Sequence, residues 1–161
     1  KRCKKMQKVW LSYIKWRMDK SMKSKLYIDK NLDQFDDHKS NLTGDFCNFC
    51  ADHLPIENNF EVYVVADREP HGISTTAAYH VGNNKCVVYG RNRALVDILR
   101  SIAHEMTHMM QDEMGLINGH VQDAGGFHED QANARAGELI KRFAKSMDER
   151  KAIYENKKFR F

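Results

Sequence analysis

The stretch of residues 101–110 constrains this chain more than any other, because it contains His104-Glu105-x-x-His108 inside a segment with helical periodicity. Positions i and i+4 of a helix lie on one face, so His104 and His108 can each direct a ring nitrogen at one metal ion about 2 Å away. Glu105 is turned by about 100° from His104, which places its carboxylate where it can take a proton from a metal-bound water. The motif therefore predicts a zinc site with a general base.

The residues around the motif favour a helix with one packed face. At about 100° per residue, the apolar residues fall on one face and the two histidines fall opposite. Such a helix suits the wall of a cleft, although two histidines on an ordinary surface or core helix remain the alternative. The apolar residues are Leu95, Ile98, Leu99, Ile102, Met106, Met109 and Met110.

The composition indicates one globular domain. The chain has 161 residues, of which 42% are hydrophobic and 10% aromatic, and it contains no apolar run of the ~20 residues that a membrane-spanning helix needs. Its cysteines do not follow the spacing of a secreted disulfide framework, and the first residues lack the apolar core of a signal peptide. We therefore expect reduced thiols and a cytoplasmic location. The cysteines are Cys3, Cys47, Cys50 and Cys86.

Positive charge is concentrated at the amino-terminal end. Residues 1–30 carry 11 Lys or Arg against two Asp, a net charge of +9, whereas the remainder has a net charge of −5. Apolar residues alternate with lysines at helical spacings there, so we expect a basic helical region over residues 1–30, packed on or appended to a domain over residues 31–161. Lysines that face water are the favoured interpretation. Contact with nucleic acid, an acidic protein or an anionic surface is the alternative, in which Trp10 and Trp16 could stack on bases.

Residues 31–44 are polar and predict a connector, followed by a short helix over about residues 43–54. This helix carries Cys47-x-x-Cys50 and then His53. A zinc knuckle needs two pairs of ligands, and no second Cys-x-x-Cys is present. Cysteines packed in the core are favoured, while a redox pair or a second metal site with His53 or His38 is the alternative.

Three strands precede the motif. Residues 60–66 are rich in β-branched and aromatic side chains, which favour a strand. Residues 75–81 and 86–89 flank a polar four-residue loop, a pattern that predicts a hairpin. After the motif, glycines at 115 and 119 end the helix, and a second helix is expected from about residue 127 to residue 145. The charged tail over residues 148–161 extends that helix or docks against the domain.

The third metal ligand has to come from the residues that follow the motif. Glu129 is favoured because it heads a helical stripe with Asn133, which could accept a hydrogen bond from a ligand imidazole and fix its tautomer. The small residues Ala132, Ala136 and Gly137 would let this helix approach the first closely. A histidine six residues beyond His108 would indicate a metzincin, but that position is Met114. The other candidates are His120, Asp123, His128 and Asp130.

The segment from Glu129 to Leu139 resembles the Glu-x-x-Ala-Asn-x-x-Ala-x-Glu-Leu helix of the ImmA/IrrE-type metallopeptidases, a gluzincin group. The resemblance covers about residues 95–143 and implies one Zn²⁺ ion held by His104, His108 and Glu129. It implies an α+β, minimal zincin-like domain, in which a small three-stranded sheet packs on the motif helix, with further helices at the amino terminus and after the motif. The chain departs from the family at Arg135, where an aromatic residue is usual, and it lacks Leu-Met-Pro after Ile140.

SprT-type proteases are the rival resemblance. They also combine a compact, basic zincin with His-Glu-x-x-His, but complete the site with a histidine in a Gly-His context, for which Gly119-His120 is the match. They act on protein bound to DNA, which would suit the basic residues 1–30. A zincin-fold regulatory or binding protein without catalysis is a further alternative.

The expected activity is zinc-dependent hydrolysis of a protein or peptide substrate, with Glu105 as the general base. By analogy with zincins, an extended substrate would lie against an edge strand, for which we nominate Ala77–His80. A further donor has to stabilise the oxyanion. The candidates for that donor are Tyr79, His80, His120, His128 and Tyr154.

Overall fold

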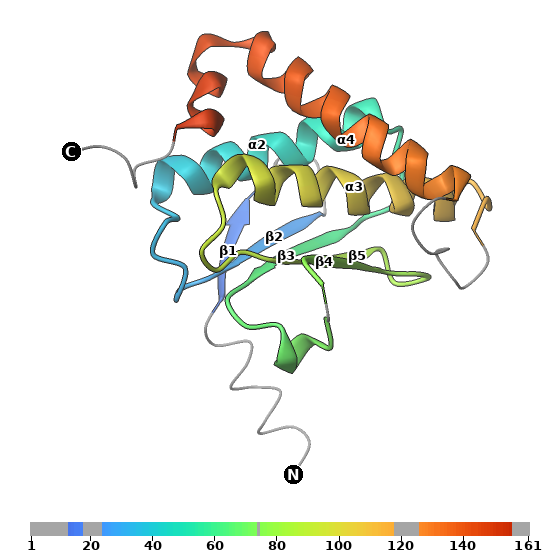
Figure 1. Cartoon of the computed structure of the whole chain (residues 1–161), viewed down its shortest axis with the longest axis horizontal. Helices are drawn as coiled ribbons and strands as arrows, with labels where there is room; N and C mark the ends of the chain where they lie inside the picture. The colour runs from blue at the N-terminus through green and yellow to red at the C-terminus, as the bar shows by residue number, and fades with distance from the viewer. Residues whose placement is uncertain (1–12, 18–23, 74, 118–125, 156–161) are drawn as a thin grey trace.

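The computed structural model describes residues 13–17, 24–73, 75–117 and 126–155, and it has an α+β fold with the α-helices on one face of a mixed sheet (Figure 1). The sheet has five strands in the order β1-β2-β3-β5-β4. Neighbours β2, β3 and β5 are parallel, while β1 and β4 run antiparallel at the two edges. The strands are β1 (Tyr13–Arg17), β2 (Lys25–Asp29), β3 (Glu61–Val65), β4 (Ala77–His80) and β5 (Lys85–Tyr89).

Two predictions were wrong: residues 13–17 and 25–29 form strands β1 and β2 where a helix was expected, and the sheet therefore has five strands instead of three. Leu26 lies opposite Val62 in the register of β2 with β3, so residues 25–29 belong to the same sheet as residues 61–89. Leu26 and Ile28 are buried and alternate with more exposed neighbours, a period of two that fits a strand. The basic residues in 1–12 and 18–23 lie outside the described residues, and so does Trp10, whereas Trp16 belongs to β1. The alternative of a nucleic-acid contact stays untested.

The hairpin before the motif follows the prediction. Strands β4 and β5 pair antiparallel, with Tyr79 opposite Cys86. The turn between them uses Gly82 at φ +84° and Asn84 at φ +48°, backbone conformations that glycine and asparagine tolerate best. Strand β4 is the last strand of the sheet, so the nominated residues form an edge strand.

The helices are α2 (Asp37–His53), α3 (Leu95–Glu113) and α4 (Phe127–Ser146), with short 3₁₀ helices η1 (Glu69–His71) and η2 (Asp148–Tyr154). Helix α2 begins earlier than predicted, and the connector is correspondingly shorter. The Asp36 carboxylate accepts a hydrogen bond from the Lys39 backbone N–H at 2.8 Å and caps the helix there. None of the helices in the described part of the chain is both long and apolar enough to cross a membrane.

The main core lies between the sheet and the helices. Every residue of the predicted apolar face of α3 is buried. Strand β3 is buried on both faces: Val62 and Val64 join the main core, while Tyr63 and Val65 join a second cluster with Val87. Such two-sided burial is typical of a strand with parallel neighbours at the centre of a sheet.

The described cysteines are packed in this core, as favoured from the sequence. Cys47, Cys50 and Cys86 are 0% exposed. Burial raises the pKa of Cys47 to about 12, because a thiolate is poorly solvated there. The ring of His53 stacks on Phe49. Among the described residues, neither His53 nor these cysteines belong to a cluster of side chains that could hold a metal ion.

Helices α3 and α4 pack through small residues, with one correction. Ala132 and Ala136 are buried, as the predicted close approach requires. A Cβ built at Gly137, however, meets nothing within 4 Å. Gly137 is therefore not needed for the contact between the two helices.

We predict that Gly137→Ala stabilises the protein by about 0.5–1 kcal/mol, because alanine restricts the unfolded chain without a clash in the folded helix. The matched control is Gly90→Ala, where the added Cβ would lie 3.0 Å from Val64 Cγ1 and 3.1 Å from Leu32 Cδ1. Overpacking should destabilise that variant by about 1–3 kcal/mol. Urea unfolding followed by circular dichroism measures both changes, and a destabilised Gly137→Ala protein would contradict the prediction.

Candidate functional site

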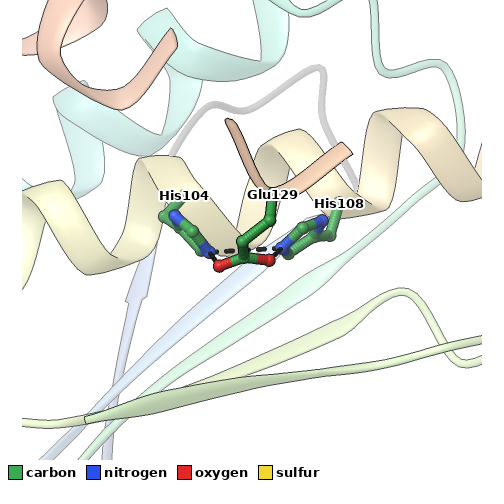
Figure 2. Close-up of side chains that lie close together, drawn as sticks. All are labelled: His104, His108 and Glu129. Carbon is green, nitrogen blue, oxygen red and sulfur yellow. Dashed lines mark hydrogen bonds and ion pairs between the residues drawn. The ribbon is translucent and has the colours of Figure 1, made fainter. Parts of the chain in front are cut away.

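Three side chains from two helices converge on one point (Figure 2). The Nε2 atoms of His104 and His108 lie 3.2 Å apart. The Glu129 carboxylate faces both, with Oε1 2.8 Å from Nε2 of His104 and Oε2 3.0 Å from Nε2 of His108. These side chains form a group that could hold a metal ion.

Local helix geometry explains this convergence. His104 and His108 are one turn apart on α3 and therefore share a face. Glu129 lies in the first turn of α4, which begins after Gly126. A carboxylate is favoured at that end because the helix dipole is positive there. Packing of Ala132 and Ala136 against α3 brings this first turn over the histidines.

The donor set fits a divalent cation. His108 is 2% exposed, and the side chains of His104 and Glu129 are about one-fifth exposed. Burial lowers the pKa of His104, opposed by the negative charge of Glu129 and reinforced by His108. The neutral ring with a free lone pair is the form that binds a metal ion. Two such nitrogens and one carboxylate are ligands that zinc and similar ions accept.

Gln111 fixes the tautomer of His108. Its amide nitrogen donates to the backbone carbonyl of His128 at 3.0 Å and to Oε1 of Gln131 at 2.9 Å. A backbone carbonyl only accepts, so the other amide atom of Gln111, 2.8 Å from Nδ1 of His108, is its oxygen. Nδ1 of His108 must then carry the proton. The lone pair is left on Nε2, the atom that faces the metal group.

Asn133 supports the other histidine. Its side chain forms a hydrogen bond with the His104 ring, a contact that partly opposes the net lowering of the His104 pKa by burial. Asn133 lies one turn beyond Glu129 on α4, the position from which this contact was predicted. Both histidines are thus oriented by amide side chains, and such contacts set the direction in which ligand lone pairs point.

Glu105 lies beside the metal group and is almost completely buried, with 8% of its surface exposed. Burial raises the pKa of its carboxyl to about 8, and the negative charge of Glu129 adds to the effect. A cation between the histidines and Glu129 would oppose the second contribution. A carboxyl group in this environment can hold or release a proton near neutral pH.

The group opens into a cleft of about 710 Å³. One wall is the edge strand β4 with the residues just before it, and the other is the histidine-bearing face of α3. The free side of β4 is therefore available along the cleft. The lining residues are Thr75, Thr76, Ala77, Ala78, Tyr79, Arg93, Asp97, Arg100, Ser101, His104, Glu105, His108, Glu129 and Asn133.

Of the five proposed oxyanion donors, Tyr79 lines the cleft. Its hydroxyl donates to Oδ2 of Asp112 at 2.5 Å, and burial together with that hydrogen bond raises its pKa. Its neighbour His80 points to the opposite face of β4, because side chains alternate along a strand.

His128 and Tyr154 are not among the residues that line the cleft. His128 contributes its backbone carbonyl to Gln111, and its Nδ1 is buried without a hydrogen-bond partner among the described residues. Tyr154 lies beside a separate hollow with Lys141 and Lys151. His120 lies outside the described residues.

The structure tests three of the five candidates for the third metal ligand, Glu129, His128 and Asp130. Among the residues that the structure describes, the metal group contains Glu129 and neither His128 nor Asp130. His120 and Asp123 fall in residues 118–125, outside the described part, so the rival site with His120 stays a prediction.

Sequence reasoning missed Gln111 and Arg93. Gln111 is three residues beyond His108, on the same helix face, so its spacing was the available signal. The side chain of Arg93 lies along α3 and so reaches the cleft, and no spacing rule predicts that path.

Comparisons of the chain with family models, curated proteins and solved structures found no match.

We predict that Gln111→Met, which keeps the size of the side chain but removes its amide, weakens zinc affinity about 10- to 100-fold, as the loss of a ligand-orienting hydrogen bond does elsewhere. Gln131→Met is the matched control, because it leaves the contact between His108 and Gln111 in place. Competition with a chelating dye measures the affinity, and ¹⁵N NMR of the metal-free proteins reports the His108 tautomer. An Nδ1-protonated His108 with wild-type affinity in Gln111→Met would contradict this role.

Proposed function

We propose that this protein is a zinc-dependent metallopeptidase. The observation that carries the proposal is the presence of one cleft that contains the His104, His108 and Glu129 group, the buried Glu105 carboxyl and the free edge of β4. A purely structural metal site has no use for a carboxyl group beside the ligands. A substrate-sized cleft is likewise unnecessary for such a site.

Zinc is the proposed ion because two imidazole nitrogens and one carboxylate form a common catalytic ligand set that leaves a coordination position open. Bound by these three residues, the ion would act as a Lewis acid that polarises the scissile carbonyl and lowers the pKa of the attacking water. The chain's contribution is to hold the three donors in place. Gln111 and Asn133 do so by orienting the two rings.

Glu105 is the proposed general base. Its carboxylate takes a proton from the attacking water and later passes it to the nitrogen of the leaving amine, so each turnover returns the residue to its starting form. Glu105 is buried except where it lines the cleft, so its carboxyl group is accessible from that side. Of the five oxyanion donors predicted from the sequence, Tyr79 lines the cleft, but its one O–H is donated to Asp112 and would have to leave that carboxylate to reach an oxyanion.

Peptide binding is proposed to use the edge strand β4. An extended peptide could add to the sheet through backbone hydrogen bonds, which recognise any sequence. Because β4 and the histidine-bearing face of α3 line the same cleft, a peptide added to β4 would pass close to His104, His108 and Glu129. This supports a peptide substrate over a small, compact one.

Glu105→Gln is expected to keep its zinc and to lose peptide cleavage, with kcat/KM falling about 10²- to 10⁴-fold because the amide cannot accept the proton. The substrate is a mixture of synthetic peptides of randomised sequence, with products identified by mass spectrometry, and zinc is quantified by elemental analysis. Unchanged turnover by the metal-loaded variant would refute Glu105 as the base. Failure of the zinc-loaded wild-type protein to cleave any peptide would refute the proposed activity.

Glu129→Ala should weaken zinc binding by at least about 100-fold, because a direct ligand contributes no less than a ligand-orienting contact. The matched control is Asp130→Ala, which removes the neighbouring, exposed carboxylate. Zinc affinity of both proteins is measured by dye competition at one pH. Equal affinities of the two variants would assign the third ligand elsewhere and favour the site with His120.

A further inference from the structure

The end of the cleft near the start of α3 is positively charged. Arg93 and Arg100 line it together with Asp97 and Ser101. None of the ion pairs in the described part of the chain involves either arginine. Asp97 is close enough to raise the pKa of Arg93, but burial has the larger, opposite effect. This end of the cleft is thus lined by two guanidinium groups and one carboxylate, and Arg68 adds positive charge near Arg93.

The guanidinium group of Arg93 is held in place by neutral acceptors. It donates to the backbone carbonyl of Tyr89 at 2.7 Å, to that of Asp97 at 3.0 Å and to Oγ of Ser101 at 2.8 Å. These contacts orient the group without neutralising it. They use three of its five N–H donors, and the other two make no hydrogen bond within the described part of the chain. A partly buried cation in this state favours an anion that replaces its lost hydration.

Both charges lie close to the metal group along α3. Arg100 precedes His104 by four residues, which is about 6 Å along a helix, and Ser101, which contacts Arg93, precedes it by about 4.5 Å. An extended peptide advances about 3.3 Å per residue. A side chain about two residues from the scissile bond would therefore lie opposite the guanidinium groups.

We propose that Arg93 and Arg100 form a subsite for a substrate carboxylate about two residues from the cleaved bond. This inference rests on the proposed peptidase function and specifies its substrate class. The carboxylate is either the side chain of Asp or Glu or the carboxyl terminus of the peptide. The second source would make the activity a removal of short carboxy-terminal peptides.

The test uses internally quenched octapeptides in an alanine–serine frame. Each peptide carries one Glu, scanned through all positions, and is paired with the same sequence carrying Gln. A second pair differs in a free or an amidated carboxyl terminus. For the wild-type zinc protein, Glu about two residues from the cleaved bond should raise kcat/KM about 5- to 20-fold over Gln, as expected for a charge-assisted hydrogen bond. A preference for the free terminus alone would identify the terminal carboxylate as the ligand.

Arg100→Gln should reduce that preference to below about 3-fold, and higher salt should weaken it in the wild-type protein. Arg93→Gln should act similarly, and Arg93→Lys, which keeps the charge, should retain part of the preference. Lys141→Gln on α4 is the matched control, because it removes an exposed cation away from this cleft. Thermal unfolding of each variant identifies losses caused by misfolding.

Equal kcat/KM for the charged and uncharged members of every pair would overturn the subsite and leave the peptidase intact. A preference that survives in Arg93→Gln/Arg100→Gln would also overturn it. If no peptide is cleaved, the proposed function fails, and the subsite is then judged by fluorescence anisotropy of labelled forms of the same pairs. Equal affinities of the zinc-loaded protein would reject it, and tighter binding of the carboxylate peptide, lost in Arg100→Gln, would support it.

Discussion

The site depends on the approach of a carboxylate to two imidazole lone pairs across the contact between α3 and α4. Nitrogen and oxygen lone pairs that point at one another across about 3 Å repel unless a proton or a cation lies between them. The distances between Glu129, His104 and His108 are therefore an arrangement that a divalent ion would stabilise strongly. Gln111 strengthens this dependence, because one buried amide contacts both His108 and the first turn of α4.

The sheet supplies the other half of the cleft. The central strand β3 has one buried cluster of side chains on each face, and the cluster on the helix side includes the apolar residues of α3. The hairpin of β4 and β5 leaves β4 at the edge, with its free side next to the histidine-bearing face of α3. Tyr79, which bonds Asp112, ties the edge strand to the far end of α3. The cleft is thus bounded by elements that the core holds in fixed positions.

The sequence predicted those parts of the fold in which one strong periodicity decided the structure. The apolar face of α3, the hairpin and the small residues of α4 are local patterns, and Glu129 followed from the spacing along one helix. Strands β1 and β2 were missed because the lysines concealed an alternation that becomes meaningful only when β2 pairs with β3, far along the chain. The early start of α2 depended on one capping side chain, Asp36. Gln111 and Arg93 act through contacts whose partners no local pattern specifies.

The most direct measurement is an anomalous difference map from crystals grown with zinc, recorded just above and below the zinc absorption edge. We expect one strong peak with Nε2 of His104, Nε2 of His108 and a Glu129 oxygen each at about 2.0–2.2 Å. A zinc-saturated crystal with no peak at this position would contradict the proposed metal site. A peak bound by the two histidines with Glu129 turned away, and another residue in its place, would contradict it as well.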